Sequence, residues 1–112
     1  MTTLTNTQVL ELKSYINGKW VTADNTVDII NPATQQVIAI APRMTKNQTE
    51  QAITAARTAF DNGEWAKTTA QERAAILHKI ANKIEESFEE FVTLETMDNG
   101  KVYGEAEGDI QD

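Results

Sequence analysis

Residues 15–21, YINGKWV, carry the strongest fold signal in this sequence. Asn17 and Gly18 separate two pairs of apolar, strand-forming residues. Both residues tolerate the positive φ angles that a two-residue hairpin turn requires. The stretch therefore predicts a β-hairpin.

A second pair of strands is predicted after this hairpin. Residues 27–30 and 37–40 are rich in β-branched side chains, and Pro32 lies between them. Because proline has no backbone N–H to donate to a strand ladder, residues 31–36 are assigned to the turn. Residues 1–14 are largely polar at their start, and we expect them to form a flexible amino-terminal arm.

The second half of the sequence predicts helices that begin at capping boxes. In this motif a Ser or Thr side chain accepts a hydrogen bond from a backbone N–H three residues later, and a Glu or Gln there reaches back. Apolar residues at helical spacing follow each motif, so each predicts a helix start. The three pairs are Thr45 with Gln48, Thr69 with Glu72, and Ser87 with Glu90.

The expected helix ends complete an α+β class, in which amino-terminal β-hairpins precede three to four helices. Gly63 is expected to close the first helix near a left-handed cap, and Trp65 to pack where the first two helices meet. Residues 98–100, Asp-Asn-Gly, form a turn after the third helix. A fourth helical pattern begins at residue 103 and is cut off at residue 112, so we expect the opening portion of a longer protein.

Composition limits the classes of function. The 112 residues suffice for one domain at most, and the net charge of −7 disfavours a nucleic-acid partner. No apolar run approaches the ~20 residues that span a bilayer, and the start lacks signal-peptide features, so a cytoplasmic location is expected. The sequence has no cysteine, which excludes disulfides, thiolate metal sites and cysteine nucleophiles from these residues.

No set of residues in the sequence assembles into an active site. The single histidine, His78, has no orienting acid or nucleophile in a suitable context, so a structural or exposed role is expected. Four glutamates within residues 85–90 are distributed around a helix, as on a solvated face. The phosphate-binding patterns GxGxxG and GxxxxGK[ST] are absent. Asp98 offers one carboxylate that suits a hard cation.

Several short motifs occur in a defined order along the sequence. They include INGKW at 16–20, NPAT at 31–34, AAR at 55–57, ER at 72–73 and ETMDNGK at 95–101. In this order and with these gaps, they resemble the amino-terminal region of the aldehyde dehydrogenase superfamily. The DNGK stretch resembles the branch that oxidises metabolic aldehydes with NAD, including the betaine-aldehyde and acetaldehyde types.

The resemblance implies that residues 15–112 form the amino-terminal part, an incomplete domain, of the NAD-binding and oligomerisation region of an α/β enzyme. In the family a cysteine thiolate attacks the aldehyde, hydride passes to NAD or NADP, and a water activated by a glutamate releases the carboxylic acid. Those residues and the nucleotide loop lie beyond this sequence. The piece alone is therefore expected to have no catalytic or cofactor-binding residues and to be inactive. The full-length enzyme is expected to be a homodimer or homotetramer.

The resemblance also implies a structural cation. Several family members hold Na⁺ or K⁺ with main-chain carbonyls just before the Asn-Pro turn and with the aspartate of the DNGK stretch. The matching positions are Ile29, Ile30 and Asp98. Oxygen ligands suit such a hard cation, and the remaining family ligands lie downstream, so the site is expected to be incomplete here.

Two functions stay open at this point. The first is the amino-terminal segment of an NAD(P)-dependent aldehyde dehydrogenase. The second is an independent, non-catalytic interaction module, suggested by three capped helices in a short chain, whose hairpin edge would pair with another chain. The sequence does not identify the aldehyde or distinguish NAD from NADP, because in the family those contacts come mostly from downstream residues.

Overall fold

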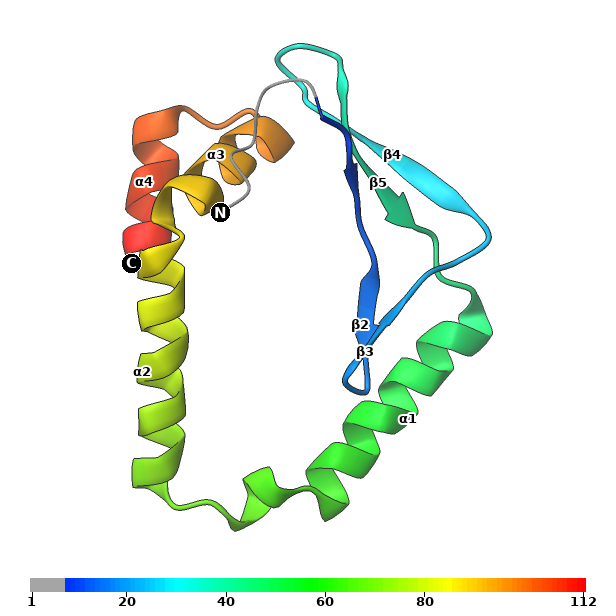
Figure 1. Cartoon of the computed structure of the whole chain (residues 1–112), viewed down its shortest axis with the longest axis vertical. Helices are drawn as coiled ribbons and strands as arrows, with labels where there is room; N and C mark the ends of the chain where they lie inside the picture. Colours follow the sequence, from blue (N-terminus) through cyan, green and yellow to red (C-terminus); the bar gives the residue numbers. More distant parts are fainter. Residues whose placement is uncertain (1–7) are drawn as a thin grey trace.

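The computed structural model describes residues 8–112, in which short strands are followed by a row of helices (Figure 1). This order confirms the predicted α+β class. The strands are β1 (Leu10–Glu11), β2 (Ser14–Ile16), β3 (Lys19–Val21), β4 (Thr26–Ile30) and β5 (Val37–Pro42). The helices are α1 (Lys46–Asn62), the 3₁₀ turn η1 (Glu64–Lys67), α2 (Ala70–Glu86), α3 (Phe88–Asn99) and α4 (Tyr103–Gln111).

The predicted hairpin is formed by β2 and β3, which pair antiparallel. Asn17 and Gly18 adopt left-handed φ angles of 50° and 76°, which asparagine tolerates and which glycine adopts freely because it has no Cβ. Tyr15 lies opposite Trp20, and their ring centroids are 4.9 Å apart. The turn and this cross-strand aromatic pair together fix the register.

The second predicted strand pair is formed by β4 and β5, which are antiparallel neighbours in a three-stranded sheet of order β1-β5-β4. In the turn, the Asn31 side-chain oxygen accepts from the Ala33 N–H at 2.9 Å, and the Asn31 N–H donates to the Gln36 carbonyl at 2.9 Å. Asparagine therefore supplies the hydrogen bonds that replace the ladder around Pro32.

The third strand of this sheet, β1, was not predicted from the sequence. Leu10 and Glu11 pair with β5 in parallel, with Leu10 opposite Ala39, and Ser14 already begins β2. The expected arm of residues 1–14 thus includes residues with regular strand pairing, while its residues 1–7 lie outside the described part of the chain.

Two of the three predicted capping boxes are present. The Thr45 and Thr69 side chains accept from the backbone N–H groups of Gln48 and Glu72, whose side chains reach back to the cap residues. The prediction for Ser87 is wrong, because its side chain makes no capping hydrogen bond. Ser87 closes α2 and opens α3 at once, so its ψ angle is 20°, far from the 161° and 163° of the two threonines.

The predicted left-handed cap at Gly63 is also wrong. Its φ angle is −78°, and its N–H donates to the Ala59 carbonyl at 2.9 Å. A Cβ at this position would lie 2.2 Å from that oxygen, so close backbone approach explains the glycine. Trp65 lies in η1 between α1 and α2, half-exposed, with the Arg73 guanidinium carbon 5.4 Å from its ring centre.

The molecule has a small core and an open shape. In the described part of the chain, Ala39, Val92 and Ala106 are the buried hydrophobic residues. The radius of gyration is 17.2 Å, whereas a compact chain of this length has about 13 Å. The accessible surface is 9085 Å², against ~6,100 Å² for a compact protein of this mass. Helices α1 and α2 diverge from η1 rather than packing on one core (Figure 1).

Candidate functional site

A cavity of about 670 Å³ lies between the three-stranded sheet and α3. It is the place where β4, β5 and the end of α3 approach one another. Its aliphatic lining comes from both sides and comprises Val9, Leu10, Leu12, Ile29, Val37, Ile38, Ala39, Leu94 and Met97. An apolar hollow of this kind can exclude water from a bound group, but offers little chemistry of its own.

The polar groups at this cavity are Gln8, Asn31, Thr34, Gln36 and Asp98. Asp98 is the one carboxylate among the lining residues, and its side chain is exposed. Amide, hydroxyl and carboxylate oxygens suit a hard monovalent or divalent cation rather than a soft metal. No group of three or more His, Cys, Asp or Glu residues that could hold a metal occurs within residues 8–112.

The three candidate cation ligands are brought together only in part. Ile29 and Asp98 line the same cavity, although they are far apart in the sequence. Ile30 follows Ile29 in β4 but is not among the lining residues, and its side chain is half-exposed. The ladder between β4 and β5 shifts register between Ile29 and Ile30. Such a shift leaves backbone groups outside the regular pairing.

The Asn-Pro turn and the end of α3 are held in close contact. Gly100 caps α3 with a φ angle of 77°, and its N–H donates to the Thr96 carbonyl. A Cβ at Gly100 would lie 2.9 Å from Pro32 Cγ. Glycine is therefore required at position 100 for two reasons: the backbone is left-handed, and Pro32 lies too close to admit a Cβ.

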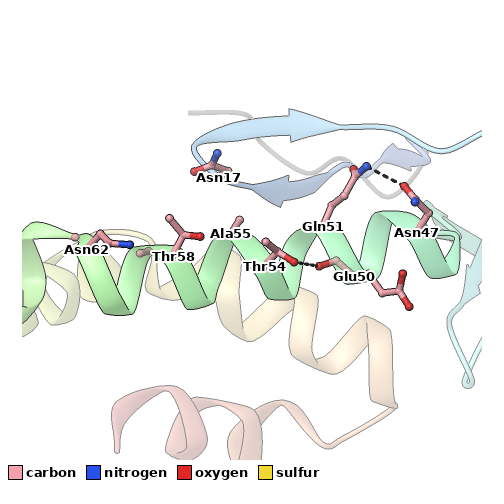
Figure 2. A pocket seen from close by; sticks show the side chains of 10 residues that line it. Asn17, Asn47, Glu50, Gln51, Thr54, Ala55, Thr58 and Asn62 are labelled. Atoms are coloured by element: carbon pink, nitrogen blue, oxygen red, sulfur yellow. Dashed lines mark hydrogen bonds between the residues drawn. The ribbon is translucent and has the colours of Figure 1, made fainter.

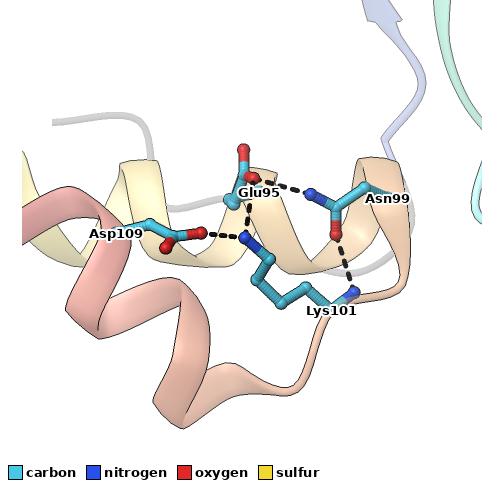
Figure 3. Close-up of polar contacts among 4 residues, drawn as sticks. All are labelled: Glu95, Asn99, Lys101 and Asp109. Atoms are coloured by element: carbon cyan, nitrogen blue, oxygen red, sulfur yellow. Dashed lines mark hydrogen bonds and ion pairs between the residues drawn. The ribbon is translucent and has the colours of Figure 1, made fainter.

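The turn after α3 is fixed by a polar cluster that the sequence analysis missed (Figure 3). The Lys101 ammonium contacts Asp109 of α4 and lies 3.9 Å from a carboxylate oxygen of Glu95 in α3. Asn99 donates to Glu95 at 2.6 Å and accepts from the Lys101 N–H at 2.7 Å. The cluster connects α4 to α3. In the sequence, the order Asn-Gly-Lys was the one feature that could have indicated it.

A second contact between these helices comes from Tyr103. Its hydroxyl donates to a Glu89 carboxylate oxygen at 2.6 Å. The hydrogen bond to Glu89 raises the pKa of the Tyr103 phenol above its ordinary value of 10.0, because ionisation would remove the proton that the phenol donates. The pair therefore acts as a structural link.

A second hollow, of about 600 Å³, lies between the β2–β3 hairpin and α1 (Figure 2). Its lining consists of small and amide side chains together with one carboxylate, Glu50. Gln51 donates to Asn47 at 2.8 Å, and the Thr54 hydroxyl donates to the Glu50 carbonyl at 2.8 Å. These contacts stay within α1, and the lining contains no nucleophile with an adjacent base.

The other residues singled out from the sequence are exposed. His78 lies on the surface of α2, and Glu85, Glu86, Glu89 and Glu90 are all exposed around the ends of α2 and α3. Glu86 pairs with Lys83. The solvated-face interpretation is confirmed. None of the helices formed by residues 8–112 has the length and apolar content needed to cross a membrane.

Comparison with known proteins gives a consistent result. A model of the aldehyde dehydrogenase family matches residues 20–112. Malonate-semialdehyde dehydrogenase of Bacillus pumilus is 41% identical over 110 residues, which cover 96% of this chain and 22% of that protein. Aminoaldehyde dehydrogenase 2 of Solanum lycopersicum is 41% identical over 100 residues, covering 88% and 20%.

Solved structures resemble the same segment. Betaine aldehyde dehydrogenase of Staphylococcus aureus, in complex with NAD⁺, superposes with a TM-score of 0.87 at 45% identity, over 92% of this chain and 21% of that chain. An NAD-dependent aldehyde dehydrogenase of Sinorhizobium meliloti has a TM-score of 0.88 at 29% identity, covering 93% and 21%. The chain thus spans about a fifth of the length of its relatives.

Proposed function

Because this chain belongs to the aldehyde dehydrogenase family, we propose that it serves as the amino-terminal part of an enzyme that oxidises an aldehyde to a carboxylic acid. The match over residues 20–112 is the observation that carries this proposal. The relatives are named for semialdehyde, aminoaldehyde and betaine aldehyde substrates, which supports an aldehyde as the substrate class. The relatives described as NAD-dependent or bound to NAD⁺ favour NAD as the hydride acceptor.

In this role the chain supplies scaffold rather than chemistry. It has no cysteine to act as the family nucleophile and no glycine-rich phosphate loop to hold a dinucleotide. Its polar clusters, such as Lys101 with Asp109, join helices to one another. NAD would accept hydride in the whole enzyme, and no residue of this chain is assigned to holding it.

A chimera tests the proposed function. This chain would replace the matching segment of the Staphylococcus aureus betaine aldehyde dehydrogenase, and NADH formation from betaine aldehyde would be followed. We expect a folded chimera that forms NADH, while the 112-residue chain alone forms none. A folded but inactive chimera would contradict the scaffold role. Aldehyde-dependent NADH formation by the chain alone would contradict the assignment of the chemistry to other residues.

The open shape favours this role over an independent interaction module. A module of this length needs a core of its own, whereas the described residues bury few apolar side chains and the radius of gyration is 17.2 Å. Cooperative thermal unfolding of a monomeric 112-residue chain would favour the module instead.

We further propose that the carbonyls of Ile29 and Ile30 and the carboxylate of Asp98 contribute to a Na⁺ or K⁺ site. The shared cavity of Ile29 and Asp98, and the register shift beside Ile30, support this. In the chimera, Asp98→Asn should abolish any increase in thermal stability that K⁺ gives over a large organic cation. An unchanged K⁺ effect would argue against Asp98 as a ligand.

We also propose an oligomeric state, a location and the absence of certain partners for the whole enzyme. We expect a homodimer or homotetramer in the cytoplasm for the whole enzyme, with neither nucleic acid nor membrane as a partner. The net charge of −7 supports the absence of nucleic acid. Light scattering of the chimera would give the oligomeric state.

A further inference from the structure

An asparagine is followed by a glycine at three places in the chain, residues 17–18, 62–63 and 99–100. Asparagine is a thermolabile residue, and its side-chain carbon can be attacked by the backbone nitrogen of the next residue. A following glycine favours this attack, because it has no Cβ to obstruct the approach. All three asparagines are exposed, so their hydrogen bonds must decide which of them reacts.

In the pair Asn99–Gly100, both reacting groups are held. The Gly100 N–H donates to the Thr96 carbonyl at 3.0 Å. The Asn99 side chain donates to Glu95 at 2.6 Å and accepts from the Lys101 N–H at 2.7 Å (Figure 3). Attack at this pair therefore requires several hydrogen bonds to open at once.

In the pair Asn62–Gly63, the attacking nitrogen alone is held. The Gly63 N–H donates to the Ala59 carbonyl at 2.9 Å at the end of α1. Within residues 8–112, the Asn62 side chain has no hydrogen-bond partner. One backbone hydrogen bond must therefore open before Gly63 can attack.

In the pair Asn17–Gly18, neither the side chain of Asn17 nor the N–H of Gly18 has a hydrogen-bond partner among residues 8–112. The pair forms the tip of the β2–β3 hairpin, which is a two-stranded sheet of its own (Figure 2). A two-stranded hairpin is marginally stable, so its turn can open to bring the two groups together. A Cβ on Gly18 would meet the Tyr15 hydroxyl at 4.0 Å, so the approach is unobstructed.

We propose that Asn17 is a site of spontaneous deamidation and is the most reactive of the three Asn-Gly pairs. The Gly18 nitrogen bonds to Asn17 Cγ, the Cγ–Nδ2 bond breaks, and the Gly18 proton passes through solvent to the departing ammonia. Water then opens the five-membered imide at either carbonyl, which yields aspartate or isoaspartate. The sequence of steps needs water alone as a co-reactant and is independent of the proposed function.

The products change the hairpin in two ways. Isoaspartate adds one backbone atom to a turn whose length sets the register of β2 and β3. Either product adds a negative charge at the hollow that Glu50 also lines, in a chain that already carries a net charge of −7. The hairpin, with its pair of Tyr15 and Trp20, should therefore loosen as the protein ages.

Peptide mass spectrometry tests the order of reactivity. The chimera with the Staphylococcus aureus enzyme would be incubated at slightly alkaline pH, both in buffer and in concentrated urea. Conversion of Asn17, Asn62 and Asn99 would be timed in each. The ratio of the rate in urea to the rate in buffer measures the protection of each site and removes the influence of the neighbouring sequence.

We expect this ratio to be about fivefold higher at Asn62 than at Asn17, because one net hydrogen bond must open, and higher again at Asn99. Gly18→Ala should slow the conversion of Asn17 and leave the other two sites unchanged. A ratio at Asn17 equal to that at Asn62, including equal ratios in a chimera that does not fold, would overturn the proposal. Unchanged conversion of Asn17 in Gly18→Ala would also overturn it, because the glycine nitrogen would not be the nucleophile.

Amide hydrogen exchange of residues 14–21 tests the effect on the hairpin. Asn17→Asp is the matched control, since it adds the charge without the extra backbone atom. We expect faster exchange in the isoaspartate form, separated by ion exchange, than in Asn17→Asp. Equal exchange in the two forms would refute the loosening of the hairpin by the added backbone atom.

Discussion

Replacing Gly100 by alanine tests the contact between the Asn-Pro turn and the end of α3. The left-handed conformation at φ 77° costs an alanine about 1–2 kcal/mol. The added Cβ would also meet Pro32 Cγ at 2.9 Å, and overpacking of this kind typically costs about 1 kcal/mol or more. The expected loss in the free energy of unfolding is therefore about 2–3 kcal/mol.

The same substitution at Gly104 is the matched control. Gly104 lies within α4, and no neighbouring atom lies within 4 Å of the position of its Cβ. Alanine is favoured over glycine in a helix by about 0.5–1 kcal/mol. Gly104→Ala should therefore stabilise the chain. The same substitution at the two positions is thus expected to change the free energy of unfolding in opposite directions.

Urea titration of the chimera with the Staphylococcus aureus enzyme, followed by far-UV circular dichroism, measures both effects. Gly100→Ala should lower the midpoint and Gly104→Ala should raise it, each by its change in free energy divided by the measured slope. A loss below about 0.5 kcal/mol would refute the reasoning. In a Pro32→Ala background the cost should fall by about 1 kcal/mol, because Cγ is gone. An undiminished cost would assign the whole effect to the backbone angle.

Three further outcomes follow from local contacts. Thr69→Ala should destabilise α2 by about 1 kcal/mol in the same titration, whereas Ser87→Ala, which removes no capping bond, should cost less than about 0.5 kcal/mol. The backbone N–H and then the hydroxyl of Thr69 hold the pKa of Glu72 below its ordinary value of 4.5. The resulting stabilisation is present above pH 4.5 and lost as the pH falls through the folded-state pKa. A pH titration of helix content should show this loss with Glu72 in place, and the loss should be absent in Glu72→Gln. Lys101→Met removes the contact with Asp109 and should cost less than about 1 kcal/mol, an effect that urea titrations in added salt should show to shrink.

The sequence predicted those features that depend on a few neighbouring residues. The Asn17-Gly18 turn is determined by two residues that tolerate positive φ, and the Thr45 and Thr69 caps by side chains three positions apart. The resemblance to aldehyde dehydrogenases also came from short ordered motifs, and the family match over residues 20–112 confirms it.

Features that depend on distant residues or on crowding were missed. Strand β1 is two residues long and pairs with β5 about thirty positions away, so it leaves almost no periodic signal. The glycine at position 63 is explained by the close approach of the Ala59 carbonyl. The missing capping hydrogen bond of Ser87 is explained by its place between two adjoining helices. At the candidate cation site, Ile29 and Asp98 line one cavity because the Asn-Pro turn and the end of α3 lie close together, although they are far apart in the sequence. The three-residue ligand set as a whole stays a prediction.

The contact of Pro32 with Gly100 has a consequence for how the chain acquires its structure. The two residues are separated by 68 positions, whereas the capped helices between them form from neighbours in sequence. Helices form in about a microsecond, while contacts between distant residues must first overcome the entropy of closing a long loop. During synthesis the hairpin, α1 and α2 can thus form as separate pieces soon after they emerge. The sheet and α3 can join only once Gly100 has left the ribosome, which makes this junction a late step in folding.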